Sequence, residues 1–116
     1  MNTEIKGEHY HVWYDEENHS IAFNGSLRLN GSNSYEPISK LLKEVSESGI
    51  DSILLDLREL EFLNSSGINT FYKFVMSMKA KPNIQVKVLG NSETPWQKKS
   101  LENMKCFLKT IELDYI

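Results

Sequence analysis

The chain has 116 residues, enough for one domain with a single hydrophobic core. Its apolar fraction of 40% and charged fraction of 25% are ordinary for a soluble globular protein. The formal net charge of −3 gives no general attraction to nucleic acid or to an acidic membrane surface, and no apolar run approaches the ~20 residues that span a bilayer. We therefore expect one domain over residues 1–116, with neither a nucleic-acid partner nor a membrane partner.

The N-terminal sequence and the single cysteine indicate a cytoplasmic protein. Residues 1–8, MNTEIKGE, lack the apolar core of a secretory signal. Cys106 has no second cysteine with which to form an internal disulfide. It falls in an expected helix, where we expect a buried thiol rather than a reactive one.

The first third of the chain predicts an antiparallel hairpin followed by a helix. Residues 9–14 and 20–29 alternate apolar and polar side chains around a turn at residues 15–18, and Gly25 is expected to mark a bulge or a close backbone approach. The spacing then predicts a helix over residues 34–48. Ser34 would cap that helix, Pro37 would lie in its first turn, and Gly49 would adopt a left-handed conformation after it.

All three histidines, His9, His11 and His19, lie in this hairpin. His9 and His11 would point to the same face of their strand and could share a metal ion. Two histidines without further ligands are more typical of ordinary strand residues. We therefore expect neither a metal site nor a cofactor.

A buried strand and an amphipathic helix form the centre of the chain. Residues 53–57 are almost continuously apolar, which is typical of a strand covered on both faces. Apolar residues then recur with helical spacing up to Met78, and the helix must end by Lys81, before Pro82. We expect one core shared by the strand and the helix, made of Ile53, Leu55, Ile68, Phe71 and Val75.

Between that strand and that helix lies the turn formed by Asn64, Ser65, Ser66 and Gly67. Asparagine and serine commonly cap helices, because their side-chain oxygens accept hydrogen bonds from free N–H groups of the first turn. The same position favours negative charge, so a serine there could accept a phosphate without strain on the fold. Local chemistry leaves both interpretations of the two serines open, a structural cap or a modified site.

The last third of the chain predicts a strand at residues 84–89, a helix that begins after Thr94, and a short strand at residues 110–115. Thr94 and Gln97 have the spacing of a capping box. Trp96, in the first turn of this helix, fits either a core position or an exposed anchor for a partner. The expected fold class is α/β with a mixed, mostly parallel sheet in the order β-β-α-β-α-β-α-β, its first strand antiparallel at or near an edge.

A hydrolase is the enzyme that this turn would suggest, since its serines follow a strand and open a helix. The glycine-serine elbow of such enzymes is absent, because Leu63 stands at its first glycine position for Ser65. No histidine follows the serines to act as a base. We therefore do not expect an enzyme.

The segment around the turn resembles the STAS domain of anti-sigma factor antagonists and sulfate transporter tails. The family has an apolar strand ending in Asp-Leu, an apolar stretch, and then D-S-[ST]-G-[LI] at a helix start. Here these are Leu55-Asp56-Leu57, residues 60–63, and N-S-S-G-I at residues 64–68. Asparagine in place of the aspartate is similar to a subgroup of free-standing bacterial STAS-like regulators, and the element order fits a whole STAS domain.

The resemblance implies a regulatory protein-binding module rather than an enzyme. Ser65 matches the serine that a partner, both anti-sigma factor and GHKL-type kinase, phosphorylates in the antagonists; a PP2C-type phosphatase would reverse this. The expected partner surface surrounds the turn and comprises Phe62, Asn64, Ser65, Ser66, Gly67 and Asn69. The alternative is a scaffold or small-ligand-sensing STAS module in which the serines carry no phosphate.

Overall fold

The structure, a computed structural model, describes residues 3–116, the side chain of Ser32 excepted. The strands are β1 (Glu4–Lys6), β2 (Tyr10–Asp15), β3 (Ser20–Leu27), β4 (Ser52–Asp56), β5 (Leu60–Leu63), β6 (Gln85–Gly90) and β7 (Glu112–Tyr115). The helices are α1 (Gly31–Ser34), α2 (Glu36–Ser46), α3 (Ser65–Ser77) and α4 (Pro95–Phe107), with a 3-10 turn η1 (Met78–Ala80) after α3.

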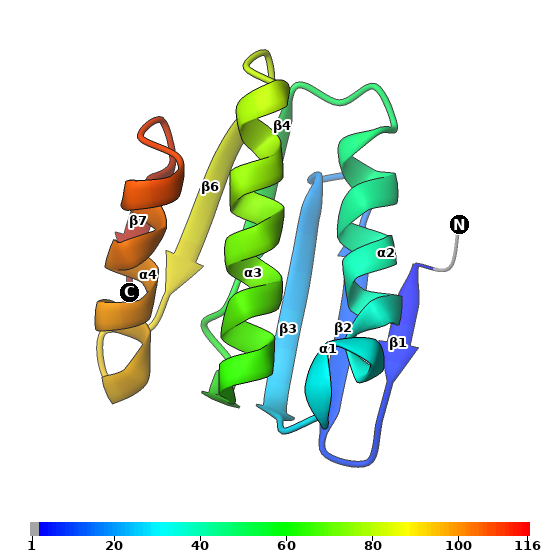
Figure 1. Cartoon of the computed structure of the whole chain (residues 1–116), viewed down its shortest axis with the longest axis vertical. Coiled ribbons are helices and arrows are strands. Elements are labelled where there is room, and N and C mark those ends of the chain that lie inside the picture. The colour runs from blue at the N-terminus through cyan, green and yellow to red at the C-terminus, as the bar shows by residue number, and fades with distance from the viewer. Residues whose placement is uncertain (1–2) are drawn as a thin grey trace.

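Helices α2, α3 and α4 lie side by side over one face of a single sheet (Figure 1). The strand order is β1-β2-β3-β4-β6-β7, and β5 pairs with β3 beside the end of β4. Pairing is antiparallel from β1 to β3 and parallel from β3 onward. The mixed sheet was predicted, but the description "mostly parallel" was wrong, because short turns join β1, β2 and β3 into an antiparallel meander.

Two strands were missing from the predicted order. The three-residue β1 is the edge strand, so the first predicted strand, now β2, lies inside the sheet. Strand β5 is formed by residues that the sequence pattern left between the central strand and its helix. Both strands are too short for periodicity to reveal.

The predicted core between the central strand and its helix is confirmed, with one residue at its margin. Ile53, Leu55, Phe71 and Val75 are buried, whereas Ile68 is half-buried against the same cluster. The rings of Phe23 on β3 and Phe71 on α3 meet edge-on, with centroids 4.9 Å apart. Strand β4 and helix α3 therefore position each other through apolar packing.

Replacing Leu55 with alanine should lower the free energy of unfolding by roughly 2–5 kcal/mol, because a fully buried side chain would leave a cavity. Leu54 is the control, since it is only half-buried on the opposite face of the same strand, and Leu54→Ala should cost less. Urea unfolding followed by circular dichroism measures both changes. Equal losses would show that the two faces of β4 contribute equally.

The predicted bulge at Gly25 is confirmed, and it directs β5 into the sheet. Gly25 has φ +93°, and a Cβ there would lie 2.2 Å from the carbonyl oxygen of His9. Before the bulge β3 pairs with β4, and from Gly25 onward it pairs with β5, with the register shifting between Gly25 and Ser26. The end of β5, and with it the start of α3, is thereby fixed beside the end of β3.

Three predicted local features are corrected by the structure. Ser34 ends α1 and does not cap α2, whose N-cap position is held by Tyr35 without a side-chain bond. Thr94 occupies the N-cap position of α4, but its side chain makes no capping bond, and Gln97 does not reach back to it. Cys106 is exposed rather than buried. Pro37 does lie in the first turn of α2, and Gly49 has φ +85° as expected.

Candidate functional site

The turn at residues 64–67 lies at the lower end of α3 in Figure 1, the end toward which β3 and β6 point. Strand β5 ends at Leu63 and α3 begins at Ser65, so Asn64 alone separates them. In sheets of this kind, residues beyond the carboxyl ends of parallel strands usually present function. The sequence predicted this placement of the turn.

Asn64 caps α3 and also ties the helix to the preceding loop. Its Oδ1 accepts a hydrogen bond from the Gly67 N–H at 3.0 Å and another from the Tyr35 hydroxyl at 2.6 Å. Its Nδ2 donates to the carbonyl oxygen of Leu29 at 2.8 Å. Burial raises the pKa of Tyr35, so its hydroxyl stays protonated and able to donate at neutral pH.

This geometry gives a physical reason for asparagine at a position where the antagonists have aspartate. An aspartate would keep both accepted bonds, but it would set a carboxylate oxygen against the Leu29 carbonyl in place of a donor. Asn64→Asp should therefore lower the free energy of unfolding by about 1–3 kcal/mol at pH 7, and Asn64→Ala, which removes all three bonds, should cost more. Thermal and urea unfolding measure both variants. An Asp variant as stable as the parent would show that the bond to Leu29 contributes nothing.

Gly67 is buried in the first turn of α3, where it packs closely against Leu63 and Tyr35. A Cβ at this position would lie 2.3 Å from Leu63 Cδ1 and 2.8 Å from the Tyr35 hydroxyl oxygen. Gly67 was predicted to belong to a partner surface, but a buried residue cannot lie on one. Its role is to let the first turn of α3 approach Tyr35 closely enough for the hydrogen bond to Asn64.

The two serines differ in exposure, and neither caps the helix. Ser65 is exposed at the first position of α3, whereas Ser66 is half-buried. Among the described residues, no hydrogen bond involves the hydroxyl of either serine, and the cap is supplied by Asn64. The interpretation of these serines as structural caps is therefore wrong, and Ser65 presents an exposed hydroxyl at the start of α3.

The other exposed residues of the predicted partner surface, Asn69 and Phe62, lie on α3 and on β5. Asn69 is exposed one helical turn further along α3, on the same face as Ser65. Phe62 on β5 is 37% exposed, and the Arg28 guanidinium carbon lies 4.3 Å from its ring centroid. We use the name Ser65 surface for Phe62, Ser65 and Asn69 together with the half-buried Asn64 and Ser66.

A hollow of about 360 Å³ adjoins the Ser65 surface and was not predicted. It is lined by the β1–β2 loop and by the end of β3, including His9, Arg28 and Leu29. Arg28 also contacts Phe62, and Leu29 accepts the bond from Asn64. The hollow is therefore continuous with the predicted surface. No sequence pattern indicated this hollow. It joins the residues before β2 to the residues at the end of β3, which come together only when the two strands pair.

The first turn of α4 holds β5 in place from the other side. Trp96 is half-buried, and its Nε1 donates to the carbonyl oxygen of Glu61 at 3.0 Å. Gln97 is fully buried: its Nε2 donates to the carbonyls of Leu57 and Leu60, and its Oε1 accepts from the Asn91 N–H. The sequence left the role of Trp96 open, and it assigned Gln97 to a cap that does not form.

The hydrogen bonds around Ser65 and the histidines bear on the hydrolase and metal-site alternatives. In the part of the chain that is described, no hydrogen bond connects Ser65 to a histidine or a carboxylate that could activate it. His11 Nε2 instead lies 2.8 Å from Glu4 Oε2, and His9 is exposed. Over residues 3–116, no group of three or more His, Cys, Asp or Glu side chains could hold a metal ion.

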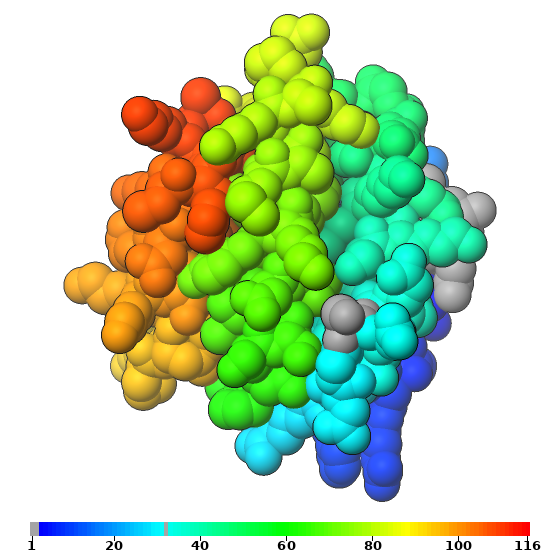
Figure 2. Space-filling model, in the orientation of Figure 1, coloured from blue at the N-terminus to red at the C-terminus, as the bar shows by residue number. Residues whose placement is uncertain are grey.

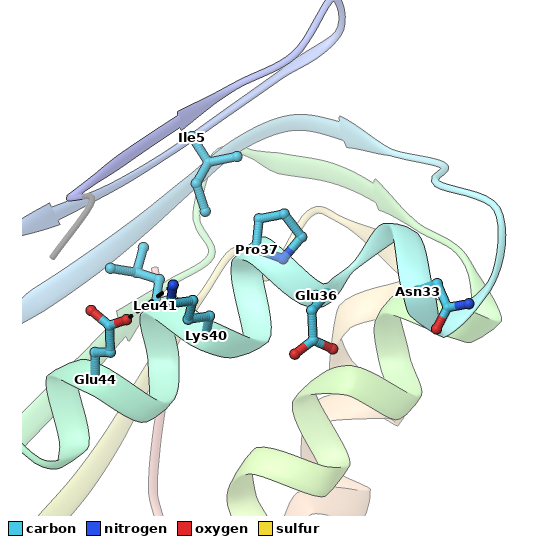
Figure 3. A pocket seen from close by; sticks show the side chains of 7 residues that line it. All are labelled: Ile5, Asn33, Glu36, Pro37, Lys40, Leu41 and Glu44. Atoms are coloured by element: carbon cyan, nitrogen blue, oxygen red, sulfur yellow. Dashed lines mark ion pairs between the residues drawn. The ribbon is translucent and has the colours of Figure 1, made fainter.

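A cavity of about 590 Å³ lies away from the turn, between β1 and α2 (Figure 3). Ile5 reaches into it from the strand, and the helix contributes Glu36, Pro37 and the ion pair between Lys40 and Glu44. None of the predicted site residues lines this cavity. It is therefore separate from the Ser65 surface.

No protein-family model matches the chain, and no curated protein matches it by sequence. Solved structures do match. One is a chain in the crystal structure of the diguanylate cyclase SiaD in complex with its activator SiaC from Pseudomonas aeruginosa, with a TM-score of 0.73 at 12% identity, covering 97% of this chain and 98% of that one. Apo-SiaC from the same organism matches with a TM-score of 0.71 at 13% identity over 96% of each chain. A further SiaC structure gives 0.70 at 12%, over 97% and 95%.

These likenesses show the fold. The chain has the architecture of SiaC, a small α/β protein of the STAS-like fold, as the sequence predicted. Because no family model matches, the N-S-S-G-I motif itself has no independent confirmation. Within the described residues, none of the helices combines the length and the apolar character needed to cross a membrane.

Proposed function

We propose that this chain is a cytoplasmic STAS-like regulatory protein that binds a partner through the Ser65 surface, and that phosphorylation of Ser65 switches this binding. The observation that carries the proposal is that Asn64, and not Ser65, caps the helix at this turn. Asn64 caps the helix, while the Ser65 hydroxyl is exposed and makes no hydrogen bond in the described chain. A serine that is not needed for the fold is available to a kinase.

The position of Ser65 suits a phosphate physically. A phosphoserine adds about −1.5 to −2 charges, which the free N–H groups and the dipole at a helix start stabilise. Against an acidic partner surface the same charge would be repelled, and like-charge contacts can cost several kcal/mol. Phosphorylation would then control association without unfolding the protein.

Two classes of partner fit the proposal. The resemblance to anti-sigma factor antagonists suggests a GHKL-type kinase that is also an anti-sigma factor, with a PP2C-type phosphatase acting in reverse. The likeness to SiaC, described as the activator of a diguanylate cyclase, suggests an enzyme whose activity depends on the bound regulator. In both cases this chain acts by binding and performs no chemistry itself.

Phosphopeptide mapping of the protein isolated from its own cells tests the switch. We expect phosphate on Ser65 and none on Ser66, because Ser66 is half-buried. Ser65→Ala should remove the phosphate, while Ser66→Ala should leave it. Phosphate on Ser66 alone, or on neither serine under every growth condition, would contradict the switch.

The hollow beside the turn favours one alternative, a ligand-sensing module. Its volume of about 360 Å³ is within the range of small-molecule sites, and a ligand there would contact Arg28 next to Phe62. The Ser65→Ala and Arg28→Ala variants distinguish the phosphorylation switch from ligand sensing. Partner binding that depends on Arg28 and a small molecule, but not on the state of Ser65, would favour ligand sensing.

A further inference from the structure

A groove with a lysine-rich rim lies between α2 and α3, away from the Ser65 surface. It runs along the seam between these helices, on the face shown in Figure 2, and has a volume of about 370 Å³. Lys43 on α2, Lys73 on α3 and Lys81 after η1 line it, with Glu47 as the one carboxylate among the lining residues. We call this feature the α2–α3 groove.

The groove is positively charged in a protein that is negative as a whole. Three lysines and one glutamate give it a formal charge of +2, against −3 for the chain. Glu47 is already engaged, because its Oε2 lies 3.8 Å from Lys81 Nζ. Within residues 3–116, neither Lys43 nor Lys73 has a carboxylate within ion-pair distance. The groove thus brings two uncompensated positive charges to opposite walls.

Other lining groups complete a site for a small molecule. Ser39 is half-buried, and among the described residues its hydroxyl makes no hydrogen bond, so it can donate one. Lys81 is held by a 3.3 Å bond to Ser46 Oγ. Phe74, only 7% exposed, provides an apolar floor. Donors around an apolar floor are the usual composition of a small-molecule site.

We propose that the α2–α3 groove binds a small polyanion, a molecule with at least two phosphate or carboxylate groups. Two ammonium groups on separate helices match two anionic groups of one ligand, and hydrogen bonds between charged groups are the stronger kind. A volume of about 370 Å³ fits a small molecule rather than a folded partner. A ligand that spans both walls would also connect α2 to α3, the helix that begins at Ser65.

Titration of the purified protein with inorganic pyrophosphate and, separately, with citrate tests the proposal by NMR. We expect amide shifts in residues 39–47 and 70–81, with a dissociation constant below ~10 mM for at least one probe. Binding of pyrophosphate alone identifies phosphate as the recognised group, and binding of citrate alone identifies carboxylate. No binding of either probe, or shifts centred on the Ser65 turn, would overturn the proposal.

Charge variants separate a site from general attraction. Lys43→Gln with Lys73→Gln should raise the dissociation constant about tenfold or more. Lys98→Gln with Lys99→Gln is the matched control, since it removes two exposed lysines from α4 and should leave binding nearly unchanged. Ser39→Ala should weaken binding by about threefold, as expected for one lost hydrogen bond. Equal weakening in both lysine pairs would show an unspecific effect of net charge and would overturn the assignment.

Discussion

Gln97→Met should lower the free energy of unfolding by about 3–6 kcal/mol, more than any other single substitution that we predict. The side chain is fully buried, and methionine has a similar shape but no strong donor or acceptor. The change would leave the carbonyl of Leu60 and the N–H of Asn91 without the partner that Gln97 gives them. It would also remove one of the two hydrogen bonds that the Leu57 carbonyl accepts, the other coming from the Leu60 N–H. Each such buried group costs about 1–3 kcal/mol. Urea unfolding measures the loss, and a loss below ~1 kcal/mol would show that water replaces the amide.

Gln97→Glu provides the matched control, because it keeps the acceptor for Asn91 and replaces only the donor. A carboxylate would face the two carbonyl oxygens, so burial and repulsion should raise the pKa of the new side chain in the folded state. The stabilising form is then the protonated one. Relative to the parent, this variant should be most stable below the ordinary glutamate pKa and should lose stability as pH rises through the raised pKa. A pH-independent difference would contradict this account of the site.

Gln97 also illustrates where sequence reasoning failed. Thr94 and Gln97 have the spacing of a capping box, and α4 does begin directly after Thr94. The glutamine side chain turns instead toward the link between β4 and β5, where its Nε2 donates to the carbonyl oxygens of Leu57 and Leu60. A local pattern cannot reveal this choice, because Leu57 and Leu60 are about forty residues away in the chain.

The core and the turn were predictable because their signals are local. The run at residues 53–57 and the helical spacing from Phe71 to Val75 produced the buried pairs that were expected. The position of Asn64, Ser65 and Ser66 at a helix start also followed from local chemistry. What could not be predicted is which side chain caps the helix, since this depends on Tyr35, 29 residues earlier, and on the close approach that Gly67 allows.

The surface around the turn was predicted only in part for the same reason. Phe62 and Asn69 were expected from their distance along the chain to Ser65. Arg28, which packs on the Phe62 ring, comes from the end of β3 and reaches this place because the bulge at Gly25 brings β5 alongside. Such a residue can be found only once strand pairing is known.

Ser65→Glu should weaken binding of the proposed regulatory partner by about 100-fold, about 2.7 kcal/mol, without lowering the melting temperature. Ser65→Ala should bind like the unphosphorylated parent. Both variants should stay within about 0.5 kcal/mol of the parent in stability, because the Ser65 hydroxyl makes no hydrogen bond in the described chain and Asn64 keeps the cap. A negative side chain in the first turn is itself favourable by about 0.3–1 kcal/mol.

The partner can be found by its dependence on this residue. The experiment incubates extract of the producing cells with three tagged chains: the parent, Ser65→Ala and Ser65→Glu. We expect all three to retain one common protein, and the retained amount, quantified by mass spectrometry, should fall only for the Ser65→Glu chain. Asn83→Glu is the matched control, since Asn83 is exposed and lies before β6, at the opposite end of the sheet from Ser65. It adds the same charge and should leave retention unchanged.

The identity of the retained protein then decides between the two partner classes, a kinase-type anti-sigma factor or an enzyme regulated by binding. Combining Phe62→Ala and Asn69→Ala should reduce retention as well, because both side chains are exposed beside Ser65. Retention that survives this pair together with Ser65→Glu would place the partner surface elsewhere. It would leave Ser65 as an exposed residue of a module that acts without this switch.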